Sequence, residues 1–133
     1  DDLYSASKAS AEIIFEAYSK SFFSKNKKIN FVTARAGNVI GGGDMKKDRI
    51  IPDIIKSLIK KTKLIIRNPN AIRPWQHVLE PLHGYLILGY YLMTNKLKNK
   101  IIPSWNFGPN IKNIKSVNEI ANKTIQLWGQ KKR

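Results

Sequence analysis

The apolar positions in the first third of the chain change from helical to strand spacing. Over residues 5–24 they recur every three or four positions, which predicts an amphipathic helix. After a polar turn at 26–28, the apolar and β-branched run 29–36 predicts a buried strand that ends at Gly37. The three glycines 41–43 then predict a hinge, or a loop that another group approaches closely.

The same alternation continues through the rest of the chain. The predicted elements are a helix at 50–61, short extended segments at 64–66 and 75–79, a strongly apolar helix at 80–95, a strand at 104–107 and a helix at 116–128. Pro52 is tolerated because it falls in the first turn of its helix. Ser116 and Glu119 have the spacing of a capping box. Strands that alternate with helices predict an α/β fold.

Composition narrows the class of protein. Of the 133 residues, 42% are hydrophobic and 25% are charged, as in an ordinary globular domain. No apolar run reaches the roughly 18 residues that a membrane span needs, so we expect no membrane association. The absence of cysteine excludes disulfides and cysteine-ligated metals and is typical of a reducing compartment. With only two histidines, we predict no metal site.

The formal net charge of +15 leaves two interpretations open. A basic chain can bind nucleic acid, but these lysines are scattered along the sequence, so a nucleic-acid-binding module is the less favoured alternative. The rarer arginines concentrate in the middle of the chain, at Arg35, Arg49, Arg67 and Arg73. Because guanidinium groups bind phosphates in a bidentate manner, this concentration predicts an anion site. Simple salt bridges would explain it equally well.

The candidate catalytic pair is Tyr4 and Lys8, in the sequence Tyr4-Ser5-Ala6-Ser7-Lys8. A spacing of four places both side chains on one face of a helix, one turn apart. A lysine charge at that place would stabilise the tyrosinate, which is the form that acts as a general base. The pair alone is close to what chance gives in a lysine-rich chain, so its weight depends on the segments that follow it.

Two loop segments carry side chains suited to recognition. Residues 35–44 follow a predicted strand, at the edge where open α/β sheets bind ligands, and Asn38 offers both a donor and an acceptor there. Residues 67–78 hold two arginines, two asparagines, a tryptophan and a histidine. A plain turn is the alternative for the first segment. For His77, a core histidine in an apolar strand is the favoured interpretation.

Taken in chain order, these segments resemble the motifs of the extended short-chain dehydrogenases/reductases. The matching motifs are Tyr4-x-x-x-Lys8, Arg35-x-x-Asn38-Val39-Ile40-Gly41, Ile50-Ile51-Pro52, Arg73-x-Trp75-x-His77-Val78 and Trp105-Asn106-Phe107-Gly108. Residues 36–44 and 67–81 look like the corresponding segments of the CDP-glucose 4,6-dehydratases within this family. Each motif alone is weak, whereas five in the same order over nearly the whole chain are specific.

The resemblance implies an NAD-dependent lyase that acts on a nucleotide sugar, CDP-glucose. The sugar would be oxidised at C4, lose water across C5 and C6, and be reduced at C6 to a 4-keto-6-deoxy product. Tyr4 would be the base, and Lys8 would tune it and contact the nicotinamide ribose. The substrate-binding residues implied by this match are Asn38, Arg49, Arg67 and Arg73. Another nucleotide-sugar dehydratase or epimerase of the family is the nearest alternative.

The resemblance also implies a division of the chain. Residues 1–43 would be the later part of an NAD-binding Rossmann-like domain with a parallel sheet, and residues 44–133 a substrate-binding lobe interleaved with the final Rossmann elements. The dinucleotide motif G-x-G-x-x-G is not in the sequence, since glycines 41–43 follow the wrong strand and lack its spacing. We therefore expect an enzyme fragment that has no turnover alone.

The resemblance carries three expectations about the full-length enzyme: a homodimer, a cytoplasmic location and a role in making O-antigen sugars. A different class remains open for the chain itself. It could be a non-catalytic binder of nucleotide sugars, or a subunit completed by a separate polypeptide. Loss of binding on substitution of Arg73 would mark such a binder.

Overall fold

The computed structural model describes residues 2–23, 29–94 and 104–129. The chain divides into two compact units that interleave along the sequence. Unit 1 comprises Asp1–Arg35 and His83–Phe107, and unit 2 comprises Ala36–Leu82 and Gly108–Arg133. The functional boundary expected near residue 43 stays a prediction.

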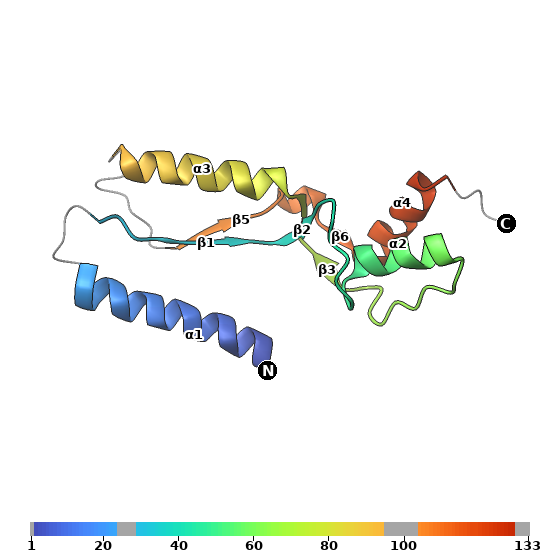
Figure 1. Ribbon diagram of the computed structural model, residues 1–133, viewed down its shortest axis with the longest axis horizontal. Coiled ribbons are helices and arrows are strands. Elements are labelled where there is room, and N and C mark those ends of the chain that lie inside the picture. Colours follow the sequence, from blue (N-terminus) through green and yellow to red (C-terminus); the bar gives the residue numbers. More distant parts are fainter. Residues whose placement is uncertain (1, 24–28, 95–103, 130–133) are drawn as a thin grey trace. The chain divides into compact units, whose positions relative to one another are not determined.

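Unit 1 layers helices on both sides of a two-stranded sheet. Figure 1 shows strands β1 (Thr33–Ala36) and β5 (Ser104–Phe107) between helices α1 (Leu3–Tyr18) and α3 (Leu79–Met93). Helix α1 continues as a π-helical segment, Ser19–Phe23. Alternation of helices and strands is thus confirmed, and it gives the α/β class expected from the sequence.

The start of α1 is fixed by a side-chain cap. The carboxylate of Asp2 accepts hydrogen bonds from the backbone N–H of Ser5 at 2.8 Å and from the Ser5 hydroxyl at 2.9 Å. These bonds, the backbone one first, hold the pKa of Asp2 below its usual value. The helix therefore begins two residues earlier than the apolar periodicity predicts, and Tyr4 falls in its first turn.

Helix α1 joins unit 1 through aromatic rings near its C-terminal end. The ring of Phe15 stacks on Phe31 with 4.3 Å between centroids, and Phe23 meets Phe31 edge-on at 4.9 Å. None of the residues of α1, all of which are described, is buried. Ile13 and Ile14, which belong to the apolar residues of the predicted amphipathic helix, are exposed.

On the opposite layer, α3 approaches β5 closely. A Cβ added to Gly84 would lie 2.3 and 2.4 Å from two ring atoms of Phe107. The same ring packs edge-on against Tyr85 at 5.2 Å. Glycine thus lets the helix backbone rest on an aromatic side chain of the strand. Further along, the amide of Asn30 donates to the backbone carbonyl of Leu92 at 2.8 Å.

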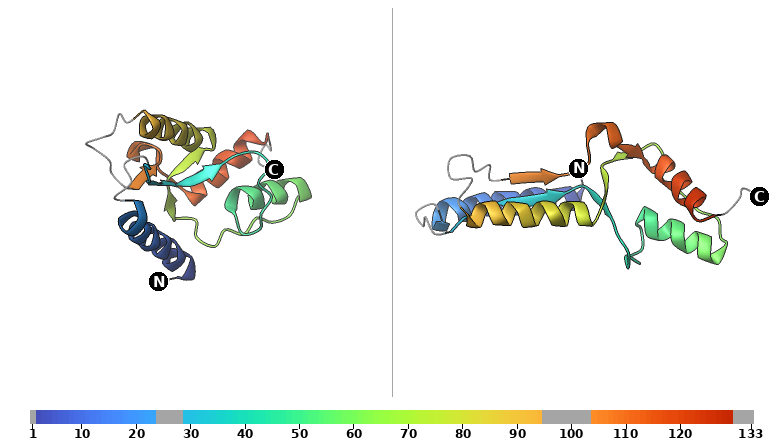
Figure 2. Two further views of the ribbon diagram at one scale, coloured as in Figure 1. Left: turned by 60° about the vertical axis from the view of Figure 1, so that its left-hand side comes forward. Right: turned by 90° about the horizontal axis from the view of Figure 1, so that it is seen from above.

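Unit 2 contains two small sheets and a pair of packed helices. Its elements are β2 (Asn38–Ile40), α2 (Ile50–Lys60), β3 (Ile72–Arg73), β4 (Trp75–His77), the 3-10 helix Ile111–Asn113, β6 (Lys115–Ser116) and α4 (Val117–Leu127). Strand β2 pairs with β4 in parallel, and β3 pairs with β6 antiparallel. Helices α2 and α4 lie side by side around a core of Ile54, Leu58 and Ala121 (Figure 2).

Two strand predictions are wrong in part. Residues 64–66 form no strand; Leu64 and Ile66 instead pack on the α2–α4 core, while Ile65 is exposed. The alternation of burial is real, but no described strand pairs with this segment. Strand β1 covers only the last four residues of the predicted run 29–36, and it is largely exposed where a buried strand was expected. Among the described strands, β5 pairs with it. The turn predicted at 26–28 lies outside the described residues.

The remaining local predictions are confirmed within narrow margins. Helix α2 begins at Ile50 with Pro52 in its first turn, as expected. Ser116 caps α4, and both bonds of the capping box with Glu119 are present.

Among the helices in the described ranges, none has the length and apolar character needed to cross a membrane.

We expect Ser116→Ala to lower the free energy of unfolding by about 1 kcal/mol. The Ser116 hydroxyl accepts from the backbone N–H of Glu119 at 3.2 Å, and alanine leaves that N–H without its side-chain partner. Urea denaturation followed by tryptophan fluorescence would measure the change. A variant with the same free energy of unfolding as the parent chain would mean that the first turn of α4 does not contribute to the stability of unit 2.

The other half of the capping box should respond to pH. The carboxylate of Glu119 accepts from the backbone N–H of Ser116 at 2.8 Å, and this bond, with further help from the Ser116 side chain and Lys115, lowers the pKa of Glu119. Its stabilisation is complete above the ordinary glutamate pKa and is lost as pH falls through the lowered value. Glu119→Gln should remove that part of the pH dependence.

Candidate functional site

Tyr4 and Lys8 occupy adjacent turns of α1, on one face of the helix. The ammonium nitrogen of Lys8 lies 5.4 Å from the centroid of the Tyr4 ring, within range of a cation–π contact. The Tyr4 side chain is accessible, with 72% of its surface exposed. The structure therefore brings the two predicted catalytic residues together and leaves the phenol open to a reacting group.

A polar network that the sequence did not suggest lies one turn beyond Lys8. Oε2 of Glu12 accepts from the Thr33 hydroxyl at 3.0 Å and from the Ser104 hydroxyl at 3.2 Å. Its other oxygen is 3.7 Å from the guanidinium Nε of Arg35. Glu12 thus connects α1 to both strands of unit 1. The one available signal was its spacing, four residues after Lys8 and eight after Tyr4.

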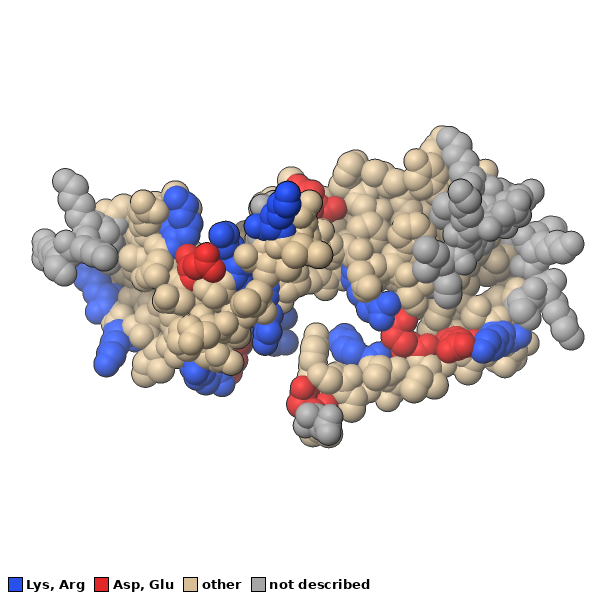
Figure 3. All heavy atoms as spheres, turned by 180° about the vertical axis from the view of Figure 1, so that it is seen from behind, with Lys and Arg blue, Asp and Glu red and all other residues tan. Residues whose placement is uncertain are grey.

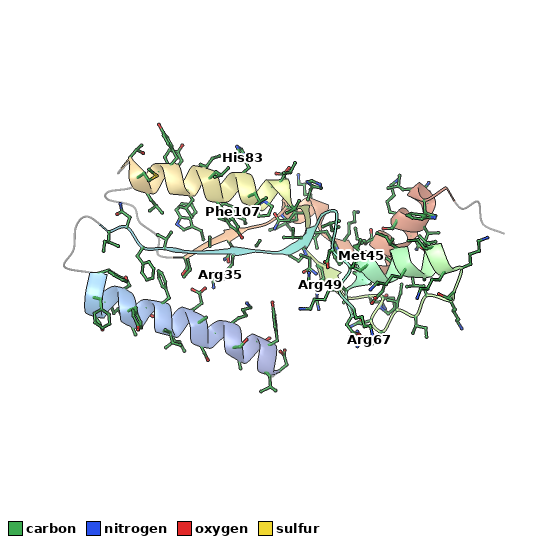
Figure 4. The ribbon with its side chains drawn as sticks, in the orientation of Figure 1. Arg35, Met45, Arg49, Arg67, His83 and Phe107 are labelled. Atoms are coloured by element: carbon green, nitrogen blue, oxygen red, sulfur yellow. The ribbon has the colours of Figure 1, made fainter. Side chains whose placement is uncertain are left out.

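Arg35 pairs with Glu12 and does not join the predicted cluster of anion-binding arginines. Figure 4 shows the Arg35 side chain between β1 and α1, where Glu12 receives it. The other three arginines belong to unit 2. For Arg35, the salt-bridge alternative is therefore the correct interpretation of its charge.

Arg49 and Arg67 both bind aspartates of the segment 44–48. The guanidinium of Arg49 donates to Asp44 at 2.9 Å, and that of Arg67 donates to Asp48 at 3.0 Å (Figure 4). Hydrogen bonding from the backbone N–H of Lys46 and from Arg49 lowers the pKa of Asp44. The Arg67–Asp48 pair is more than three-quarters exposed on both sides, so an anionic ligand could displace it at little cost.

The backbone has a positive φ angle at both ends of the segment 43–48. Gly43 has φ of +80°, which favours glycine, and Asp48 has φ of +63°, which few side chains adopt without cost. In between, the ammonium of Lys56 donates to the carbonyl of Met45 at 2.7 Å. The loop that follows the three glycines is therefore bonded to helix α2 through Lys56.

Arg73 and Asn38 lie on different small sheets of unit 2. Arg73 is on β3, which pairs with β6, and Asn38 is on β2, which pairs with β4. Arg73 is exposed, and its guanidinium donates to the carbonyl of Ile72 at 3.0 Å. Among the described residues it forms no ion pair, which distinguishes it from Arg49 and Arg67. Asn38 is exposed at the start of β2, opposite Trp75. An exposed guanidinium and an exposed amide are suited to a phosphate or a sugar hydroxyl.

Close packing holds these segments in register. A Cβ on Gly37 would lie 2.7 Å from both Cγ and the carbonyl oxygen of Pro74, and one on Gly41 would lie 3.0 Å from the Val78 side chain. The indole N–H of Trp75 donates to the carbonyl of Lys115 at 3.0 Å, which ties β4 to β6. The segments that flank β2 and β4 therefore pack so closely that side chains larger than glycine would not fit at positions 37 and 41 without a shift of their neighbours.

His77 is not the core histidine expected from the sequence. Its side chain is exposed, and its Nδ1 accepts from the backbone N–H of Leu79 at 3.3 Å. That position places it at the first turn of α3, where helix N–H groups lack intrahelical partners. The apolar neighbours that suggested burial point elsewhere, since side chains alternate along a strand.

Charge is unevenly divided between the units. In the described part of unit 1, the acidic residues Asp2, Glu12 and Glu16 balance the basic residues Lys8, Lys20 and Arg35. In the described part of unit 2, lysine and arginine outnumber aspartate and glutamate, and Figure 3 shows their spheres gathered over the part that holds α2 and α4. The excess positive charge of the described residues thus accompanies the candidate anion-binding arginines.

The two groups of candidate residues suit two different tasks. In unit 1, a phenol with a neighbouring ammonium can accept a proton from a hydroxyl. In unit 2, exposed arginines on a basic surface can bind an anion.

Comparison with known proteins gives concordant results. A curated CDP-glucose 4,6-dehydratase of Salmonella typhimurium (strain LT2) is 47% identical over 132 residues, which is 96% of this chain and 36% of the relative. The chain thus spans about a third of the length of the curated relative it matches. Residues 2–90 match the model of the NAD dependent epimerase/dehydratase family.

Solved structures agree with the fold. The NAD complex of dTDP-glucose 4,6-dehydratase from Bacillus anthracis superposes with a TM-score of 0.73 and 27% identity, over 99% of this chain and 38% of that one. UDP-glucuronic acid 4-epimerase from Bacillus cereus gives a TM-score of 0.73 at 21% identity, over 96% and 37%, and supports the fold alone. From the family match over two-thirds of its length and the resemblance of its motifs, the chain belongs to the NAD dependent epimerase/dehydratase family.

Proposed function

We propose that this chain forms the catalytic helix and the substrate-binding part of an NAD-dependent 4,6-dehydratase that acts on CDP-glucose. The observation that carries the proposal is the 47% identity to a CDP-glucose 4,6-dehydratase along 96% of the chain. The geometry supports it, because the aligned motifs supply an accessible phenol beside an ammonium and an exposed arginine without a carboxylate partner among the described residues.

The residues on α1 suit one end of the cofactor. The Lys8 ammonium and the Tyr4 phenol can both donate hydrogen bonds to ribose hydroxyls. The sequence holds no G-x-G-x-x-G motif for the pyrophosphate, so this chain would hold only the nicotinamide ribose. Bound NAD would supply the hydride chemistry of the reaction, oxidation at C4 of the sugar and reduction at C6 after the loss of water.

The chain's own residues have separate roles in the proposal. Tyr4 as the tyrosinate takes the proton of the sugar hydroxyl at C4 and becomes a neutral phenol, and the Lys8 charge stabilises the tyrosinate before this transfer. Arg73 and Asn38 bind the diphosphate region, while Arg49 and Arg67 lie near the nucleotide and exchange their aspartate partners for it. These assignments follow the motif match and stay predictions, as do the homodimer, the cytoplasmic location and the O-antigen role.

The test splices the full chain into the Salmonella typhimurium enzyme in place of its matching segment. The chimera should convert CDP-glucose with NAD to a 4-keto-6-deoxy product, which mass spectrometry and its carbonyl absorbance would detect. The chain alone should give no product, since it lacks the pyrophosphate motif. A folded chimera that releases only an epimer would contradict the dehydratase assignment, and one that releases no product would contradict the activity.

Binding to the chain alone separates the remaining classes. A nucleotide-sugar binder should take up CDP-glucose in calorimetry and lose it in Arg73→Ala, with Lys112→Ala as a matched control on the same unit. A nucleic-acid-binding module should instead bind random DNA with an affinity that falls steeply with salt. Strong salt-dependent DNA binding without CDP-glucose binding would favour that alternative.

A further inference from the structure

We propose that Glu12 is a positioning residue that fixes the Tyr4–Lys8 end of α1 against the strands of unit 1. The inference rests on the proposed function, since it concerns the placement of the proposed base. Glu12 follows Lys8 by four residues and Tyr4 by eight, so all three side chains lie toward one face of the helix.

The contacts of Glu12 span two strands that are distant in sequence. The Thr33 hydroxyl on β1 and the Ser104 hydroxyl on β5 both donate to Oε2 of Glu12. The two hydroxyl oxygens are also 3.0 Å apart. Because each hydroxyl has one proton, two of the three contacts are hydrogen bonds at any moment, and every such arrangement keeps Glu12 bonded to the strand pair. Bonds to an ionised acceptor are stronger than neutral ones.

Burial and charge set Glu12 apart from the other acids of α1. Its side chain is 29% exposed, whereas that of Glu16, one turn further, is 65% exposed. Glu16 binds Lys20 of its own helical run at 2.6 Å. Glu12 instead faces Arg35 of β1. Removing its charge would take the carboxylate away from the guanidinium and leave the two hydroxyls a neutral acceptor, which binds them more weakly.

Glu12 attaches α1 to the strands at a point closer to the catalytic pair than the aromatic contact of Phe15 is. The aromatic contacts of α1 involve Phe15, which is about 16 Å along the helix from Tyr4, against about 12 Å for Glu12. No residue of α1 is buried, so the helix has little apolar packing to hold its first turns. Misplacing a reacting group by about 1 Å can cost about a hundredfold in rate.

The test compares Glu12→Gln, Glu12→Asp and the matched control Glu16→Gln in the chimera of full chain and Salmonella typhimurium enzyme. We expect Glu12→Gln to lower kcat about tenfold or more. KM for CDP-glucose should stay within about twofold, because the proposed substrate arginines belong to unit 2. Glu12→Asp, which keeps the charge, should recover part of kcat, and Glu16→Gln should match the parent.

A second measurement uses the chain alone and needs no turnover. Hydrogen exchange of the amides in residues 3–11 should speed up in Glu12→Gln and not in Glu16→Gln, because a released helix end opens more often. If Glu12→Gln matches Glu16→Gln in kcat and in exchange, the positioning role is wrong. If KM rises while kcat holds, Glu12 acts on substrate binding and the inference is overturned.

The two measurements keep the inference separate from the proposed function. An unsubstituted chimera without product would overturn the dehydratase proposal alone. The exchange comparison would still decide whether Glu12 holds the first turns of α1. Faster exchange in Glu12→Gln would support the anchoring, and unchanged exchange would overturn it.

Discussion

Tyr4→Phe is expected to lower kcat of the chimera by a factor of about 10²–10⁴, the range that general acid–base catalysis contributes. The substitution removes only the hydroxyl, and Tyr4 is largely exposed, so folding should not change. The Lys8 ammonium would still lie over a ring but would have no phenolate to stabilise. Initial rates of product formation at saturating CDP-glucose and NAD would measure the loss.

The same helix offers a matched control for this prediction. Tyr18 is exposed at the end of α1 and packs at 5.1 Å against Phe22, a contact that needs only its ring. Tyr18→Phe should therefore keep the parent kcat. If Tyr4→Phe retained more than half of the parent kcat while both variants bound CDP-glucose normally, the proton would leave through another group.

Gly84→Ala is expected to lower the free energy of unfolding by about 1–2 kcal/mol, as overpacking outweighs a helix-propensity gain of about 1 kcal/mol. Its Cβ would lie 2.3 Å from the Phe107 ring, so α3 and β5 must separate or the ring must leave Tyr85. Urea denaturation monitored by tryptophan fluorescence gives this value. Phe107→Leu in the same chain should restore part of the stability by making room.

Gly89 provides the control within the same helix. A Cβ there meets nothing within 4 Å, so Gly89→Ala should raise the free energy of unfolding by about 0.5–1 kcal/mol through helix propensity alone. The opposite signs of the two substitutions are the result to look for. Stabilisation by both would mean that the Phe107 ring moves freely and that β5 does not depend on it.

Local signals explain what the sequence predicted correctly. The capping box at Ser116 and Glu119 and the proline in the first turn of α2 act over three or four residues, and the structure has both. Helix α3 was recognisable because most of its fifteen residues are apolar, although several of them, including Leu86 and Met93, are exposed. The family could be recognised from the sequence because each of its motifs spans only a few neighbouring residues.

Pairing between distant segments explains what the sequence did not predict. The apolar run 64–66 looked like a short strand, but a strand needs a neighbour, and none of the described strands pairs with it. Arg35 was grouped with later arginines, and only the folded chain shows Glu12 beside it. The hydroxyls of Thr33 and Ser104 carry no sequence signal at all for a carboxylate partner.

The tight fit of β2 against β4 has a consequence for how this sequence can diverge. Gly37 and Gly41 flank β2, and Pro74 and Val78 flank β4 at distances too short for another side chain. A larger residue on one strand would need a smaller one, or a displaced backbone, on the other. Substitutions at positions 37 and 74, and at 41 and 78, should therefore occur in correlated pairs among descendants, even though the two segments are far apart in the gene.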